Sequence, residues 1–247
     1  MSSRSSIPAI GDITRRARAH LLQRKRVKDF SAALSPTPRP DLVTVGDLGY
    51  GGYMLPASLL GPDSVCYLAG VGEDISFDLG VIARFGCNVY SIDPVPRAKA
   101  HAEAAAKHEP RLTFLPFALW SRDETLTFHA PREEGYVSQS AVNLHGTAGD
   151  FQAEARSLSS LMEEHGNDHI DLLKISAEGS EYEIVEHVVS SGIDVRVLCV
   201  EYAQPAPVER AVASVRSLER AGYKLVAQSV PMWNWKLTFV GPRAESI

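Results

Sequence analysis

Polar residues suited to chemistry gather where an apolar run of the sequence ends. Segment 171–183 reads DLLKISAEGSEYE, and its pattern up to Ile175 is that of a buried strand. Ser176, Glu178 and Gly179 follow at once, before a helix begins. In parallel sheets, ligands bind at the carboxyl ends of strands, where a hydroxyl or carboxylate can orient a substrate or accept its proton. The segment therefore predicts part of a binding site.

A second candidate site follows the apolar run VCYLA. There the sequence AGVGEDIS places Gly70 and Gly72 at a turn from a strand into a helix. Glycine permits a tight backbone that a ligand can approach closely, and a helix N-terminus offers unpaired N–H groups. The next apolar run ends in SIDP, so that Asp93 stands 23 residues after Gly70. A carboxylate at that spacing can accept hydrogen bonds from both ribose hydroxyls, so the pattern predicts an adenosine-type ligand.

The residues around this turn favour S-adenosylmethionine over NAD. The dinucleotide fingerprint G-x-G-x-x-G needs a third glycine, which the segment GVGEDI lacks. Glu73 and Asp74 would repel a pyrophosphate, whereas a sulfonium is positively charged and carries no phosphate. An NAD-dependent Rossmann enzyme remains the less favoured alternative.

Other candidate residues each have two interpretations. Glu178 can point into the site as a catalytic residue, or stabilise the following helix through its dipole. His145 can deprotonate an acceptor hydroxyl, or be a solvated loop histidine. Glu201 ends the apolar run at 195–200, a position that favours a catalytic role. The segment YGGY at 50–53 can fold over the cofactor or form a simple turn.

The elements that position these residues alternate along the chain. Apolar runs predict strands at 65–69, 88–92, 112–115, 170–175 and 195–200, with helical patterns between them. Continuous apolar strands separated by helices indicate a parallel sheet covered on both faces. The runs at 223–228 and 235–240 are joined by a segment too short for a helical crossover, so these two strands should be antiparallel.

The alternation also divides the chain. Residues 1–40 are expected to form a basic helix and a proline-rich linker, and residues 41–247 a single domain. Between about 121 and 160 the alternation stops, and one alternating run is followed by polar loop material. We expect this insertion to lie over the active site.

The N-terminal helix is expected to be a solvated appendage, with an anionic partner as the alternative interpretation. Its apolar residues that could line one side are Ile13, Ala17, Leu21, Val27 and Phe30.

Bulk composition narrows the class of protein. With 45% hydrophobic and 22% charged residues, the 247-residue chain is typical of a globular protein. Its net charge of −5 gives no support to a nucleic-acid surface, and no apolar run is long enough to span a bilayer. Cys66, Cys87 and Cys199 lack metal-ligand spacing and fit free thiols in a reducing compartment. We therefore expect a cytoplasmic protein without a metal, nucleic-acid or membrane partner.

An ordered set of segments resembles the FkbM-type S-adenosylmethionine-dependent methyltransferases. In chain order these are YGGYMLP, SVCYLAGVGEDISFDLGVIARFGCNVYSIDPVPRA, FALWSRDETLTF, IDLLKISAEGSEYEIV, VLCVEY and WNWKLTFV, covering roughly residues 49–240. The resemblance implies the class I methyltransferase fold, an α/β Rossmann-like sandwich with a mostly parallel seven-stranded sheet and an antiparallel last strand. The cofactor-binding residues it implies are Ala69, Gly70, Val71, Gly72, Asp93, Pro94, Phe117, Ala118 and Ser176.

The chain departs from this family's pattern at two places. Leu68 and Ala69 stand where many class I methyltransferases have an acidic residue, and Ser176 stands where the family usually has Asp. A serine is neutral at physiological pH and cannot act unassisted as a base. We expect a methyltransferase that acts on the hydroxyl of a small molecule or sugar. The alternative is a non-catalytic relative that binds S-adenosylmethionine or S-adenosylhomocysteine. A homo-oligomer is compatible with the sequence.

Overall fold

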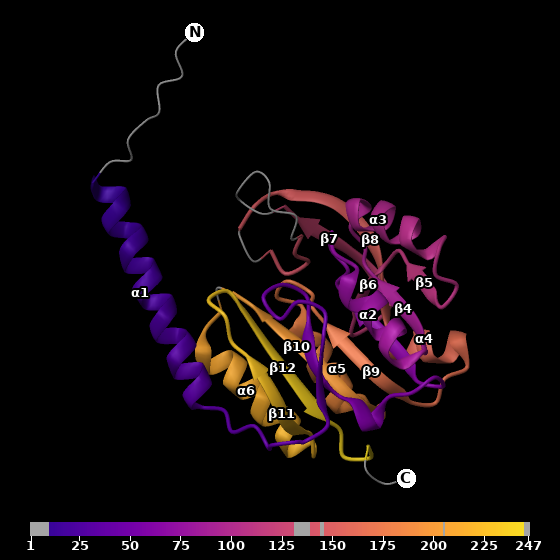
Figure 1. The fold of residues 1–247 in the computed structure, drawn as a ribbon. Coiled ribbons are helices and arrows are strands. Elements are labelled where there is room, and N and C mark those ends of the chain that lie inside the picture. The colour runs from indigo at the N-terminus through magenta and orange to yellow at the C-terminus, as the bar shows by residue number, and fades with distance from the viewer. Residues whose placement is uncertain (1–9, 131–138, 144–145, 205, 245–247) are drawn as a thin grey trace.

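A computed structural model describes residues 10–130, 139–143, 146–204 and 206–244 (Figure 1). Within these residues the chain forms a seven-stranded sheet in the order β11-β12-β10-β9-β3-β4-β5. The strands are β3 (Val65–Ala69), β4 (Asn88–Ile92), β5 (Leu112–Leu115), β9 (Ile170–Ile175), β10 (Val195–Ala203), β11 (Lys224–Ser229) and β12 (Asn234–Val240). Six of them run in the same direction, and β12 lies antiparallel between β10 and β11. The predicted sheet is confirmed, including its antiparallel last strand.

Helices cover both faces of this sheet, as the uninterrupted apolar strands require. The helices are α1 (Ile10–Ala32), α2 (Ser76–Phe85), α3 (Pro96–Ala106), α4 (Leu158–His165), α5 (Glu181–Ser191) and α6 (Val208–Arg220). One apolar core lies between the sheet and α4, α5, α6 and the end of α1. The other lies between the sheet and α2, α3 and a hairpin of β1 (Leu42–Val45) and β2 (Tyr53–Pro56), which leads into a short 3-10 helix at Ala57–Leu59. The two cores hold the strand ends in fixed positions.

Helix α1 is docked at its C-terminal end rather than fully solvated. The ring of Phe30 is completely buried and stacks on Trp235 with 4.2 Å between centroids. The side chain of Gln23 donates a hydrogen bond to the carbonyl of Met232. Leu21, one of the apolar residues that could line one side of the helix, is 65% exposed, and the side chains of residues 13 and 17 lie outside the described ones. In Figure 1 the other end of α1 projects beyond the domain.

The insertion at 121–160 is more regular than expected. Among the described residues, two strands of the insertion form a separate sheet with β6, which directly precedes it, in the order β6-β8-β7. They are β6 (Ala118–Trp120), β7 (Glu124–His129) and β8 (Gly149–Ser157). Strand β8 was not predicted; its residues Phe151, Ala153 and Ala155 join the small apolar core of this sheet. The alternating sequence FQAEA is the signal that predicts such a strand.

No helix among the described residues is long and apolar enough to cross a membrane.

Candidate active site

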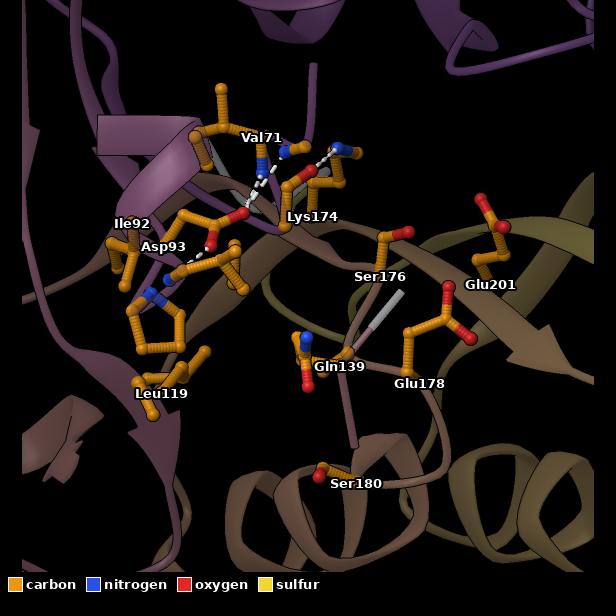
Figure 2. Close-up of a pocket in the computed structure, with 18 of the residues that line it drawn as sticks. Val71, Ile92, Asp93, Leu119, Gln139, Lys174, Ser176, Glu178, Ser180 and Glu201 are labelled. Atoms are coloured by element: carbon orange, nitrogen blue, oxygen red, sulfur yellow. Dashed lines mark hydrogen bonds between the residues drawn. The ribbon is translucent and has the colours of Figure 1, made fainter. Parts of the chain in front are cut away.

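A cavity opens at the carboxyl ends of the central strands and extends to the small β6-β8-β7 sheet (Figure 2). The expected site residues that line it are Ala69, Gly70, Val71, Gly72, Asp93, Pro94, Ala118, Ser176, Glu178 and Glu201. They come from the ends of β3, β4, β9 and β10 and from the start of β6. Segments that are far apart in the sequence thus meet at one edge of the sheet.

Two expected site residues are not placed at this cavity. Phe117 is half-buried, packs against the main core and has the guanidinium of Arg156 5.6 Å from its ring centroid. The cavity wall beside it is formed instead by Ala118, Leu119 and Trp120. The expectation that Phe117 lines the adenine region is therefore not supported. His145 lies outside the described residues.

The glycine turn after β3 is pressed against the end of β9. Gly70 has φ +88°, and a Cβ atom built there would lie 1.9 Å from the carbonyl oxygen of Ser176. The N–H of Ser176 donates a hydrogen bond of 3.1 Å to the carbonyl of Ala69. Gly72 also has positive φ, +61°, but open space surrounds the position of its Cβ. Glycine is thus required at position 70 by both backbone conformation and close approach.

Asp93 fixes the same turn from the neighbouring strand. Its Oδ2 accepts hydrogen bonds of 2.9 Å from the N–H groups of Val71 and Gly72, and its Oδ1 accepts one of 2.8 Å from Val95. Burial raises the pKa of this carboxyl group, while the three N–H groups and nearby Lys174 oppose the shift. Since each carboxylate oxygen has two acceptor sites, Asp93 retains capacity for a ribose hydroxyl. Asp93 thus holds the glycine turn in place, a structural role that the sequence did not predict.

Lys174 is a site residue that the sequence interpretation missed. It lies within β9, is almost completely buried and donates a 2.6 Å hydrogen bond from Nζ to the carbonyl of Gly70 (Figure 2). Its charge stabilises the ionised forms of Asp78, Asp93 and Glu201, three buried carboxyl groups around the turn. A lysine inside the apolar run IDLLKI is the signal that could have identified it, because an unpaired charge is rarely buried.

Glu201 and Ser176 lie close together on the opposite side of the cavity. Glu201 is 7% exposed and stands across from Lys236 in the pairing of β10 with β12. Burial raises the pKa of Glu201 and nearby Glu178 adds to the shift, while Lys236, Lys174 and the Ser176 hydroxyl oppose it. In Figure 2 the Ser176 side chain points toward Glu201.

Glu178 points its carboxylate into the cavity rather than across the start of α5 (Figure 2). Its backbone has φ +40°, which is uncommon for a residue with a side chain, and its carbonyl accepts a 2.7 Å hydrogen bond from the Ser140 hydroxyl. Buried Glu181 accepts the N–H groups of Gly179 and Ala203, at 2.6 and 2.9 Å. Of the two interpretations of Glu178, the geometry supports the cavity-facing one.

The loop between β1 and β2 forms part of the cavity wall. Tyr50 and Gly51 line the cavity, and the Nζ of buried Lys236 donates hydrogen bonds to the carbonyls of Leu48 and Tyr50. The first two residues of the YGGY segment therefore border the cavity. The acidic pair is also at the cavity: Glu73 forms an ion pair with Arg97 at 2.5 Å, and Asp74 accepts the Ser76 N–H at 2.8 Å.

These residues fit S-adenosylmethionine. The glycine turn allows close approach, and Asp93 offers a carboxylate for a ribose. Ile92, Leu119 and Phe128 provide apolar walls suited to an adenine ring. The acidic residues suit a sulfonium and disfavour the pyrophosphate of NAD. Among the described residues, no group of His, Cys, Asp and Glu could hold a metal ion.

Comparison with solved structures finds distant likenesses. Fibrillarin from Aeropyrum pernix with natively bound S-adenosylmethionine is 11% identical with a TM-score of 0.41, over 74% of this chain and 68% of that one. A fibrillarin from Methanococcus jannaschii is 13% identical with a TM-score of 0.44, over 85% and 86%. A precorrin-6y C5,15-methyltransferase from Geobacter metallireducens is 14% identical with a TM-score of 0.43, over 75% and 84%.

Sequence comparison is more specific. No curated protein matches the chain significantly. A family model described as Methyltransferase FkbM domain matches residues 70–225, which include the glycine turn, Asp93 and the β9–α5 junction. Since this match spans more than half of the chain, the protein belongs to the FkbM family of methyltransferases, whose methyl donor is S-adenosylmethionine.

Proposed function

We propose that the protein methylates a hydroxyl oxygen of a small molecule or sugar. The observation that carries this proposal is the polar cluster of Ser176, Glu178 and Glu201, which shares one cavity with the glycine turn and Asp93. Carboxylates and a hydroxyl can accept hydrogen bonds from an acceptor hydroxyl and take up its proton. The acidic lining disfavours phosphorylated or otherwise anionic acceptors.

The residues of the chain would divide the work between two sides of the cavity. The glycine turn and Asp93 would hold S-adenosylmethionine, with apolar contacts from Ile92 and Leu119. The bound cofactor supplies an electrophilic methyl group on a sulfonium. On the other side, Glu178 and Glu201 would orient the acceptor and accept its proton. Because the leaving thioether is neutral, correct positioning of the two reactants should supply much of the rate acceleration.

A methyl-transfer assay tests this proposal. The purified protein is incubated with methyl-labelled S-adenosylmethionine and a panel of sugars and small alcohols, each matched by an amine analogue. Mass spectrometry of the products identifies the methylated atom. Transfer to oxygen in the alcohols supports the proposal, whereas transfer restricted to the amines contradicts it.

A non-catalytic role is the second candidate, favoured by Ser176 at the position of the family's usual Asp. Calorimetric titration with S-adenosylmethionine, in parallel with the transfer assay, distinguishes the two. Tight binding of the cofactor without transfer to any acceptor would favour the binding role. NAD serves as the control ligand, and we expect it to bind much more weakly.

A further inference from the structure

Ser176, which stands where the family usually has Asp, lies beside Glu201, a buried carboxyl group on the neighbouring strand β10. We propose that Ser176 and Glu201 act together as the proton acceptor of the transfer reaction, with the Ser176 hydroxyl passing the acceptor's proton to the Glu201 carboxylate. This inference rests on the proposed function and specifies the proton route at the same site.

Strand register brings the two residues together. Ile175 and Val200 are paired across the parallel strands β9 and β10. The residues that follow them, Ser176 directly after β9 and Glu201 within β10, therefore lie side by side. Both line the cavity, and the Ser176 side chain points toward Glu201 (Figure 2). Their proximity is fixed by the sheet and does not depend on a loop.

The surroundings of Glu201 suit a group that must change its protonation state. Lys236 on β12 and Lys174 on β9 favour its ionised form, whereas burial and Glu178 favour its neutral form. Tyr50 and Tyr53, from the β1–β2 hairpin, also face the Glu201 charge, which helps to keep their phenols protonated. Burial thus favours proton uptake by Glu201, and the two lysines stabilise the ionised form that accepts the proton.

A serine at position 176 is chemically consistent with this route. A hydroxyl can accept one proton while donating another, which a carboxylate cannot do. The Asp usual in the family would place a further negative charge beside Glu178 and Glu201. In this chain Ser176 would supply the relay and Glu201 the charge.

The proposed step conserves atoms, electrons and protons. The acceptor O–H bond breaks, and the oxygen uses an electron pair to bond the methyl carbon, while the electrons of the broken carbon–sulfur bond stay on sulfur. The released proton binds the Ser176 Oγ, whose own proton passes to a carboxylate oxygen of Glu201. Ser176 is regenerated, and Glu201 ends as a neutral acid that returns its proton to solvent.

The pairing can be tested without any acceptor. The titration of Glu201 is followed by NMR of carboxyl-labelled glutamate, with the signal assigned by its loss in Glu201→Gln. Ser176→Ala removes a hydroxyl that favours the ionised form of Glu201, so we expect the pKa of Glu201 to rise. Glu178→Gln is the matched control and should lower the pKa, because it removes a neighbouring negative charge. An unchanged Glu201 pKa in Ser176→Ala would overturn the pairing.

The catalytic role is tested once an acceptor is identified. Glu201→Gln should lower turnover on the order of 100-fold or more, while the affinity for S-adenosylmethionine stays within about twofold. Ser176→Ala should lose a comparable factor, and Ser176→Thr, which keeps the hydroxyl, should recover most of it. The pH dependence of turnover should move with the Glu201 pKa measured by NMR.

The outcomes separate this inference from the proposed function. An active wild-type protein whose turnover depends on Glu178 and is insensitive to Ser176→Ala would overturn the proton route alone. A wild-type protein that binds S-adenosylmethionine but methylates no alcohol would overturn the proposed function, and the catalytic role with it.

Discussion

The two sides of the cavity are held by different kinds of contacts. On the cofactor side, Asp93 and Lys174 bind backbone groups of the glycine turn, and Gly70 touches the backbone of Ser176. On the acceptor side, the groups that face the cavity are side chains from separate segments, chiefly Glu178 and Glu201. The cofactor side is therefore fixed by main-chain geometry, whereas the acceptor side can change by substitution of single side chains.

This difference explains where the chain departs from its family. A substitution that disturbs the glycine turn would disturb the backbone of β3 and β9 together. Ser176 in place of Asp changes only a side chain that faces the cavity, and the N–H of this residue keeps its bond to Ala69. We expect variation within the family to concentrate on the acceptor side for the same reason.

The largest expected effect tests the close approach on the cofactor side. Gly70→Ala would force a Cβ into the carbonyl oxygen of Ser176, so we expect loss of folding or of S-adenosylmethionine binding. Gly72→Ala is the matched control: its backbone strain costs about 1–2 kcal/mol, but no atom obstructs its Cβ. Urea unfolding and calorimetry measure both. Equal effects would show that backbone conformation alone governs this turn.

The sequence predicts the cofactor side better than the acceptor side, for a physical reason. The glycine turn and Asp93 each follow an apolar run, and their spacing reflects one strand–helix–strand unit. Local pattern is enough to find them. The proximity of Ser176 to Glu201, by contrast, depends on which strands are neighbours. The position of Tyr50 at the cavity depends on a hydrogen bond from a buried lysine on the last strand.

Two errors in the prediction have specific causes. Helix α1 was expected to be a solvated appendage, but its C-terminal end docks through Phe30 and Gln23, and no hydrophobic pattern reveals the hydrogen bond of Gln23 to Met232. Strand β8 was overlooked because polar residues alternate with small apolar ones, so that its apolar face is weak in the sequence. In both cases the deciding contact is with a distant part of the chain.

The second largest effect is expected at Asp93. In Asp93→Ala, the N–H groups of Val71, Gly72 and Val95 lose their acceptor. We expect the affinity for S-adenosylmethionine to fall at least tenfold and the free energy of unfolding to fall by about 1–3 kcal/mol for each N–H left unsatisfied.

Asp93→Asn provides the control, because one amide oxygen can still accept two of these N–H groups. Its stability should lie between those of wild type and Asp93→Ala, as measured by urea unfolding. Full stability in the alanine variant would show that Asp93 does not hold the turn.

A smaller effect concerns the pH dependence of stability and Glu181, the buried first residue of α5. Burial raises the pKa of Glu181 from 4.5 to about 8, against the two N–H groups that it accepts. A folded-state pKa above the unfolded value stabilises the protein fully below pH 4.5, and this stabilisation is lost as pH rises through about 8. The contribution changes by at most about 1.4 kcal/mol per pH unit.

Comparison with Glu181→Gln isolates this contribution. The free energy of unfolding of both proteins is measured between pH 5 and pH 8, and the difference between them should shrink or reverse as pH rises. A constant difference over this interval would mean that Glu181 titrates at its ordinary pKa and is held in its charged form by Gly179 and Ala203.

The smallest expected effect tests backbone strain on the acceptor side. Glu178 has φ +40°, a conformation that costs a residue with a side chain about 1–2 kcal/mol and glycine almost nothing. Glu178→Gly and Glu178→Ala both remove the carboxylate that faces Glu201 and Glu181, so this electrostatic change cancels between them. Glycine also loses more chain entropy on folding, and we therefore expect the glycine variant to be more stable by only about 1 kcal/mol. Both variants should bind S-adenosylmethionine like the wild type, because the turn around Gly70 is held by Asp93 and Lys174. An alanine variant as stable as the glycine variant would show that the junction relaxes freely, and that the acceptor side does not depend on this strained backbone.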